Sequence, residues 1–346
     1  MSPSKKLGPS TKLGTSRRKF ITRGALGVGA AAVVGITSQD EASAQRITKW
    51  DRSADVVIAG AGASGLCAAI MARDQGASVL IVEQNHDIGG HAMVSGGRIP
   101  LGGGTRLQKK FGVVDSADQV YLDHTDFHNL ELRYSDRDLV RVWADENAAT
   151  FDFLLDNGVQ FEEVMPTLVN EGTVPRLFRT KVYSEDLKVT INGSPGSGLV
   201  RALEKSARAK GVDILLRHSL TRIVRDNGSR VTGITATVDN RPVNVEARRG
   251  FIIATGGFTS NVAFRRMFDP RLTEEYQVAG EPWSKQNADG EMLAMAIGAA
   301  LWERRTSRAS TDARSQRHVT SALATDTRIC GGIQEARCFH RSAAPV

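Results

Sequence analysis

Two short apolar runs flank a helical pattern within the first hundred residues. Residues 54–59 (ADVVIA) and 78–82 (SVLIV) are continuous apolar runs of strand length, which is typical of strands buried on both faces. Between them, from Leu66 to Ala72, apolar residues recur on one side of a helix. The pattern predicts a βαβ unit, in which a helix joins two parallel strands.

Further along the chain, similar patterns predict two more helices and a series of short strands. Ser135 and Asp138 have the spacing of a capping box, which predicts the start of a helix that Gly158 ends. A second helix is predicted over 198–208. Short strands are predicted at 212–216, 223–224, 231–238, 243–247 and 251–253, with turns at 226–228 and 239–240. Together the elements predict an α/β fold.

The turn between the first strand and the first helix has the sequence of a dinucleotide-binding fingerprint. Gly60 permits the tight turn, Gly62 allows the backbone to approach a pyrophosphate, and Gly65 lets the helix pack close to the strand. The helix N-terminus supplies N–H groups and partial positive charge to the diphosphate. Glu83 ends the second strand, where a carboxylate accepts hydrogen bonds from an unphosphorylated ribose. FAD or NAD is therefore favoured over NADP.

More glycines follow than a plain NAD dehydrogenase needs. They lie in Gly89-Gly90-His91, Ser95-Gly96-Gly97 and Gly102-Gly103-Gly104, and they would let a loop lie along the ribityl chain and the flavin. The buried run 251–254 ends in Thr255-Gly256-Gly257. A buried strand seldom ends in two glycines unless the backbone must come close to another group.

These motifs, with Asn287-Ala288-Asp289-Gly290 and Met292, resemble those of a flavoprotein family over about residues 54–301. That family includes soluble fumarate reductases, the succinate dehydrogenase flavoprotein, urocanate reductase and ketosteroid dehydrogenases. The resemblance implies a Rossmann-like FAD-binding domain with a parallel central sheet and an inserted β meander that returns to the sheet at Phe251. It also implies hydride transfer through flavin N5 to or from a C–C bond of a small-molecule substrate or electron acceptor. The cofactor-binding residues that it implies are Gly60, Gly62, Ala63, Ser64, Gly65, Glu83, Gln84, Gly89, Gly90, His91, Ser95, Gly96, Gly97, Thr255, Gly256, Gly257, Asp289 and Gly290.

Two of these residues have more than one interpretation. His91 lies in a loop where succinate dehydrogenases carry a histidine bonded covalently to the flavin, but its neighbours here differ from theirs. Covalent attachment, a noncovalent polar contact and an exposed loop histidine all stay open. Asp289 is either a cofactor contact or the N-cap of a helix that begins at Gly290.

The sequence names no catalytic acid or base, and its histidines lack the spacing of metal ligands. Two other functions stay open. An NAD-dependent dehydrogenase would share residues 60–83 but would not account for the later glycines. A flavin-binding module without turnover is the second alternative.

The formal net charge of +7 arises mostly in the first 23 residues, which contain seven Lys and Arg side chains. The remainder is nearly balanced and does not indicate a nucleic-acid partner. Residues 1–44 have the layout of an export signal: paired Arg17 and Arg18, a short apolar run over 24–36, and Ala42-Ser43-Ala44. The pair resembles a twin-arginine signal, which implies the twin-arginine translocase as a partner and an exported, periplasmic protein. The run is too short for a stable membrane anchor.

The apolar pattern fades after Trp302. Residues 302–346 contain eight arginines and no lysine. We therefore predict an FAD-binding domain over 45–301 and a poorly ordered tail over 302–346, in place of the family's substrate-capping domain. A frameshift or truncation would give such a tail, as would a short natural variant. On this basis weak FAD binding and little turnover are expected.

Overall fold

The computed structural model describes residues 47, 49–126, 132, 135–168, 173–184, 193–226, 230–276, 278, 280–281 and 283–301. The chain divides into two units, 1–48 and 49–346, and the account below concerns the second. The predicted export signal and the arginine-rich tail lie outside the described residues, as does most of the predicted turn at 226–228.

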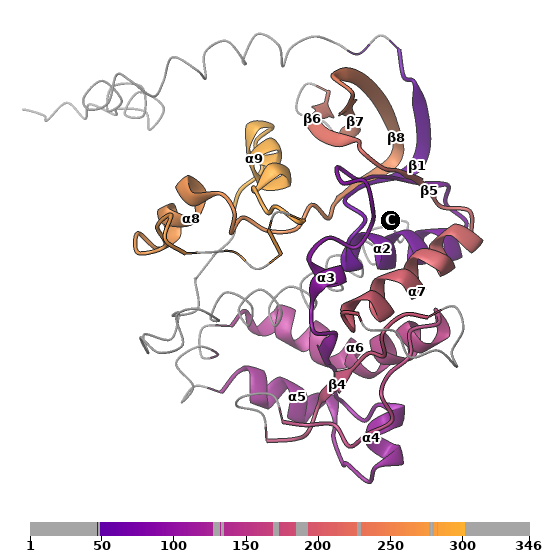
Figure 1. Cartoon of the computed structure of the whole chain (residues 1–346), viewed down its shortest axis with the longest axis vertical. Helices are drawn as coiled ribbons and strands as arrows, with labels where there is room; N and C mark the ends of the chain where they lie inside the picture. The colour runs from indigo at the N-terminus through magenta and orange to yellow at the C-terminus, as the bar shows by residue number, and fades with distance from the viewer. Residues whose placement is uncertain are drawn as a thin grey trace, which may run out of the picture. The chain divides into compact units, whose positions relative to one another are not determined.

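A six-stranded sheet of order β5-β2-β1-β8-β7-β6 forms the centre of this unit (Figure 1). Strands β5, β2, β1 and β8 are parallel, whereas β7 and β6 continue the sheet as an antiparallel meander. The bounds are β1 Arg52–Ala59, β2 Val79–Val82, β5 Asp213–Leu215, β6 Ser219–Arg225, β7 Val231–Val238 and β8 Arg241–Ile253. The predicted parallel sheet with an added meander is therefore confirmed.

Strand β8 corrects one detail of the sequence prediction, because the two separate runs 243–247 and 251–253 form a single strand. Its first half pairs with β7 on one side, and its part from Val245 onward pairs with β1 on the other, from Val245 opposite Arg52 to Ile253 opposite Ala59. Between the two halves, β8 advances three residues from Ala247 to Gly250 while β1 advances two from Ala54 to Val56, so an irregularity in the β8 register joins the two predicted runs. The turn from β7 into β8 has Asp239 and Asn240 at φ of 47° and 60°, as a two-residue hairpin of type I′ requires.

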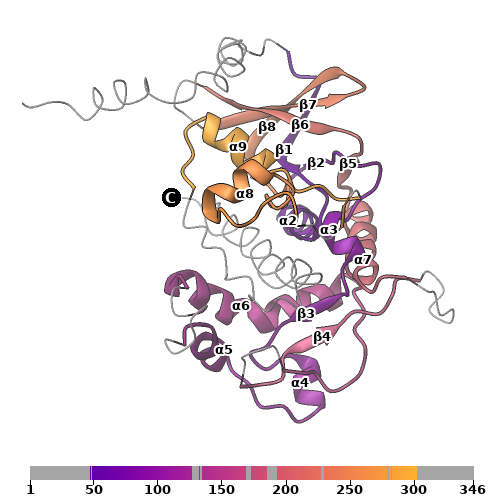
Figure 2. The same cartoon turned by 60° about the vertical axis from the view of Figure 1, so that its left-hand side comes forward.

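The two faces of the sheet are covered differently. Side chains alternate along β1, so that Val56 and Ile58 belong to a core shared with helices α2 (Ala63–Asp74) and α7 (Gly196–Ala209). Val57 and Ala59 point the other way and pack with meander residues such as Ile234. In Figure 2 the meander and the two helices accordingly lie on opposite sides of β1 and β2.

The remaining elements are the long helix α6, several short helices and a two-stranded ribbon. They are α3 Gly90–Val94, β3 Arg98–Pro100, α4 Arg106–Lys110, α5 Ala117–His124, α6 Arg137–Asp156, β4 Leu177–Arg179, α8 Val262–Phe268 and α9 Asp289–Ala296. The predicted capping box is wrong by one residue, because Asp136 is the N-cap of α6 and its Oδ1 accepts from the N–H groups of Asp138 and Leu139. Among the described residues, no helix has both the length and the apolar character needed to cross a bilayer.

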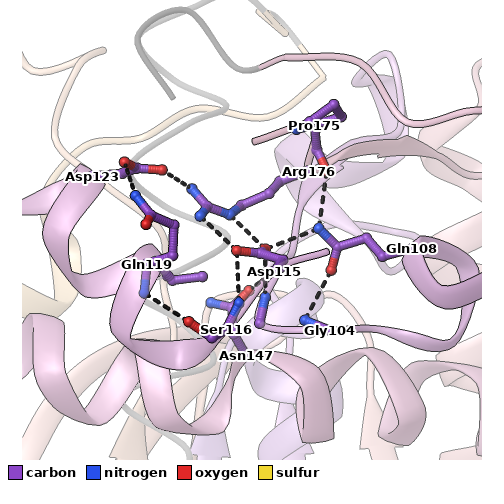
Figure 3. Close-up of polar contacts among 12 residues, drawn as sticks. Gly104, Gln108, Asp115, Ser116, Gln119, Asp123, Asn147, Pro175 and Arg176 are labelled. Carbon is purple, nitrogen blue, oxygen red and sulfur yellow. Dashed lines mark hydrogen bonds and ion pairs between the residues drawn. The ribbon is translucent and has the colours of Figure 1, made fainter. Parts of the chain in front are cut away.

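A buried ionic cluster joins the ribbon to α4, α5 and α6 (Figure 3). Arg176 Nε and Nη2 donate to Asp115 at 2.8 Å each, and Nη1 donates to Asp123 Oδ2 at 2.6 Å. All three side chains are at most 6% exposed. Burial acts to raise the pKa of both carboxyl groups, but the hydrogen bonds from Arg176 and from other neighbours, together with the positive charge of Arg176, outweigh it and leave each pKa below its usual range.

The same cluster explains the glycines at 102–104, which we expected along the flavin. Gly102 and Gly103 donate their N–H groups to Asn147 and Asp115. A Cβ on Gly102 would lie 2.4 Å from Arg176 Cδ. Gly102 thus has a role that the sequence did not indicate, because its lack of a side chain makes room for the buried ion pair, whereas Gly103 takes up a φ of +76° and donates to Asp115.

We predict that Arg176→Met lowers the free energy of unfolding by about 3–5 kcal/mol, because it leaves two carboxylates buried without their cation. Arg179→Met, at the end of strand β4, is the matched control. The ion pair of Arg179 with Glu162 is 3.9 Å long, and both side chains are exposed to solvent. It should cost at most about 1 kcal/mol. Urea unfolding of both variants at neutral pH measures the difference, and equal losses would contradict this account of the cluster.

Candidate functional site

The fingerprint turn brings three stretches of backbone together. Gly60 has φ of +104°, and a Cβ there would lie 2.2 Å from the carbonyl oxygen of Ala254. A Cβ on Gly65 would lie 1.9 Å from the carbonyl oxygen of Gly60. Only glycine permits either approach, so the roles predicted for Gly60 and Gly65 agree with the geometry.

The start of α2 has the features of an anion site. Its N-cap is Gly62, which has no side chain, so no side-chain hydrogen bond caps the helix. No other described atom lies within 4 Å of the place where a Cβ on Gly62 would stand. The N–H groups of Ala63, Ser64 and Gly65 belong to the first turn, where helical N–H groups lack a partner within the helix. Open space beside such N–H groups fits a diphosphate.

Glu83 follows β2 and is tied to the fingerprint turn. Its Oε2 accepts from the N–H of Ala61 at 2.7 Å, and its Oε1 accepts from the N–H of Asn85 at 2.9 Å. The residue is 6% exposed, and burial raises the pKa of its carboxyl group in spite of these hydrogen bonds. Each oxygen keeps a second lone pair for a ribose hydroxyl. Glu83 therefore also has a structural role, which the sequence motif did not reveal.

The segment after Glu83 returns to the same turn. Gln84 is exposed, and Gly89, at φ of +100°, donates its N–H to the carbonyl oxygen of Ala61 at 2.9 Å. Gly90, also at positive φ, begins α3. His91 lies half-buried in that helix, with Nδ1 3.2 Å from Ser284 Oγ. Of its three interpretations, an exposed loop histidine does not describe this position.

Ser95, Gly96 and Gly97 lie at the other end of α3 and have different roles. Ser95 Oγ donates to the carbonyl oxygen of Ala92 and accepts from the N–H of Gly97. Gly97 has φ of +63°, and a Cβ there would lie 2.3 Å from Thr180 Oγ1, so packing requires glycine. Gly96 faces open space, as Gly62 does. The structure thus leaves Gly96 as the member of this motif that a ligand can approach.

The end of β8 and the start of α9 form the third part of the site. The N–H of Ala254 donates to the carbonyl oxygen of Ala59, which places Thr255 and the glycines after it next to the fingerprint turn. Gly256 has φ of +93°. A Cβ on Gly290 would lie 2.4 Å from Thr255 Oγ1, so α9 begins directly against this strand end.

The N-cap interpretation of Asp289 is wrong. The N-cap of α9 is Ala288, which has φ of +63°, and Asp289 is the first residue of the helix. The N–H of Ala288 donates to the carbonyl oxygen of Gly257, and this bond fixes the entry into α9. Burial raises the pKa of Asp289.

These parts meet beyond the carboxyl ends of β2, β1 and β8, where ligands bind in open parallel sheets. The predicted residues of the fingerprint turn, Glu83, Gly89 and the strand end after Ala254 are joined by direct contacts. Sequence reasoning missed Asn85 and the segment around Ser284. Asn85 Nδ2 donates to the carbonyl oxygen of Trp283 at 3.2 Å. No periodicity or motif marks these residues.

The residues present fit a dinucleotide better than a metal ion. An uncapped helix start beside open space suits a diphosphate, and a buried carboxylate at the second strand suits a ribose. Among the described residues, no group of three or more His, Cys, Asp or Glu side chains is arranged to hold a metal.

We predict that Gly62→Val abolishes cofactor binding, because a branched side chain would occupy the open space at the start of α2. Met71→Val is the control, since it places the same β-branched residue in the last turn of this helix. The measurement is flavin released from the purified proteins by heat, with far-UV circular dichroism as a check on the fold. Parental flavin content in Gly62→Val would contradict a diphosphate site at this turn.

Known proteins support the same assignment. Residues 55–311 match the family described as the FAD binding domain. The chain is 30% identical over 290 residues to the acrylate reductase flavoprotein subunit of Shewanella woodyi, covering 81% of this chain and 53% of that protein. It is 30% identical over 260 residues to the NADH:fumarate oxidoreductase of Klebsiella pneumoniae, covering 70% of this chain and 26% of that protein. The chain thus spans about half the length, or less, of these relatives.

Among solved structures, the 3-ketosteroid-Δ4-(5α)-dehydrogenase of Rhodococcus jostii RHA1 is similar at a TM-score of 0.65 and 29% identity, over 75% of this chain and 56% of that one. A flavocytochrome c3 fumarate reductase shares the fold at a TM-score of 0.62 and 22% identity, over 76% and 43%. The similarity to flavoproteins disfavours the NAD-dependent alternative. The chain therefore belongs to the FAD-binding family of flavoprotein oxidoreductases, with FAD as its cofactor.

Proposed function

We propose that this domain forms the flavin-binding part of an enzyme that transfers hydride to or from a C–C bond next to an electron-withdrawing group. The observation that carries the proposal is the convergence of the uncapped α2 start, Glu83 and the glycine end of β8 at one edge of the sheet. Acrylate, fumarate and urocanate reductases among the relatives support this class of reaction.

The described residues would hold the cofactor mainly through backbone groups. The first turn of α2 would bind the diphosphate, and Glu83 would accept hydrogen bonds from the ribose. The open space beside Gly96 allows a planar ring system to approach the main chain closely. When bound, FAD supplies the hydride donor or acceptor. The protein's part is to fix its position and to shield it from water.

We propose small α,β-unsaturated acids or enones as the substrate class, because acrylate, fumarate and urocanate reductases and a 3-ketosteroid dehydrogenase are among the similar proteins. The test is a single-turnover experiment under anaerobic conditions. The flavin of the purified 346-residue chain is reduced with dithionite and mixed with fumarate, acrylate, urocanate or a 3-ketosteroid enone. Little steady-state turnover is expected of this chain, but within a single turnover we expect at least one of these acceptors to reoxidise the reduced flavin faster than its saturated analogue does.

Failure with all four acceptors, in a protein that retains FAD, would contradict the reaction class and leave the cofactor assignment in place. That outcome would favour a flavin-binding module without turnover. Absence of bound flavin would overturn both parts.

We also propose that residues 1–44 direct export through the twin-arginine translocase, on the basis of Arg17-Arg18 and the short apolar run after them. Arg17→Lys combined with Arg18→Lys preserves the positive charge. A general secretory signal should tolerate this change, whereas twin-arginine export should be lost. Fractionation of cells expressing each form measures it, with Lys5→Arg and Lys6→Arg as the control, and undiminished export of the Arg17/Arg18 variant would refute the proposal.

A further inference from the structure

Helix α7 lies beside α3 and the loop that precedes it, with contacts from Asp87 to Ser95 (Figure 1). At its start, the N–H of Gly196 donates to the carbonyl oxygen of Ser95, and a Cβ on Gly196 would lie 2.0 Å from the carbonyl oxygen of Ala92. One turn later, Val200 Cγ2 lies 2.9 Å from the place of a Cβ on Gly89. The segment thus follows the surface of α7 in the opposite direction to the helix.

The next residue of α7 makes an ionic contact with this segment. Arg201 Nη1 donates to Asp87 Oδ1 at 2.8 Å, and Nη2 donates to Oδ2 of the same carboxylate. Such a bidentate pair fixes orientation as well as distance. Burial acts to raise the pKa of Asp87, but the hydrogen bonds from Arg201 and from the N–H of Ile88, together with the positive charge of Arg201, outweigh it and keep the pKa below its usual range. The carboxyl group is therefore charged at neutral pH.

Asp87 lies in the loop between two contacts with the same residue of the fingerprint turn. Glu83 accepts from the N–H of Ala61, and Gly89 donates to the carbonyl oxygen of Ala61. The two ends of the loop are thereby fixed, and the side chain of Asp87 anchors the part between them. Ile88, which donates its N–H to Asp87 Oδ1 at 2.8 Å, is fully buried and forms part of the main core.

We infer that Arg201 is a positioning residue for the cofactor: by holding Asp87 it fixes the loop that aligns Glu83 with the ribose and Gly89-Gly90 with the rest of FAD. This inference rests on FAD as the cofactor and not on the proposed reaction. Arg201 itself need not touch FAD, since it acts from the α7 side of the loop.

The pair contributes to alignment more than to the stability of the fold. About 30% of the Arg201 side chain and 26% of the Asp87 side chain are exposed, and ion pairs in contact with water add little to stability. Arg201 also donates to Glu204 Oε2 at 2.9 Å, so loss of Asp87 leaves the guanidinium with a partner. Asp87→Asn therefore perturbs the loop without leaving a buried charge unpaired.

The test is a double-mutant cycle of Asp87→Asn and Arg201→Gln in the full chain. FAD affinity is measured by flavin fluorescence, and the unfolding midpoint is measured on FAD-free protein. We expect each single variant to raise the Kd for FAD about tenfold, and the double variant to be no weaker than either, as for two residues that act as a unit. The FAD-free unfolding midpoints should stay close to that of the parent, because a partly exposed ion pair adds little to stability. A rise in Kd at an unchanged midpoint then reports the position of the loop and not a loss of folding.

Arg208→Gln is the matched control, because it removes another ion pair to Glu204 from the exposed part of the same helix. It should leave the Kd unchanged. Arg201→Lys keeps the charge but loses the bidentate geometry, and its Kd should lie between those of the parent and Arg201→Gln. If a neutral variant does not fold, the Kd of Arg201→Lys tests the inference in its place. Parental affinity in the single variants, additive effects in the double variant, or an equal loss in Arg208→Gln would each overturn the inference.

Discussion

The close approach of three main-chain segments at Gly60 is the constraint on which the site depends. The turn after β1 passes so near to the end of β8 that a Cβ on Gly60 would lie 2.2 Å from a carbonyl oxygen, and α2 approaches the turn equally closely at Gly65. These contacts make the end of β1, the start of α2 and the end of β8 one rigid corner. A cofactor at that corner meets N–H groups and open space where side chains would otherwise stand.

The same principle recurs where α9 meets β8. Gly290 allows the helix to begin against Thr255, and the bond from Ala288 N–H to the carbonyl oxygen of Gly257 holds the strand end in place. Ala288 takes up a φ of +63° to make this connection, a conformation that costs energy in any residue with a side chain. Its persistence in a fully buried residue shows that the surrounding contacts outweigh the strain.

Sequence patterns predicted the parts of this structure that depend on local periodicity or on glycine spacing. The βαβ unit, the short strands after α7 and the roles of Gly60 and Gly65 are examples, whereas the arrangement of those strands as a meander was implied by the family resemblance. Sequence patterns did not indicate the role of a glycine where a run of glycines can serve either ligand binding or close packing. Gly102 lies in a run of glycines that has the composition of a ligand loop, yet its lack of a side chain makes room for Arg176 and Asp115. Which group a glycine makes room for depends on residues distant in sequence, and no local pattern contains that information.

The contacts of Glu83, Asp87 and Ser284 were missed for a related reason. Each is a side chain that holds one backbone segment against another: Glu83 against Ala61, Asp87 against α7, and Ser284 against His91. A site built largely from main-chain groups cannot be tuned by exchanging the atoms that touch the ligand, because those atoms are common to all residues. Its affinity must instead depend on side chains that set where the backbone runs. Variation in such a site is therefore to be sought in the residues that face away from the cofactor.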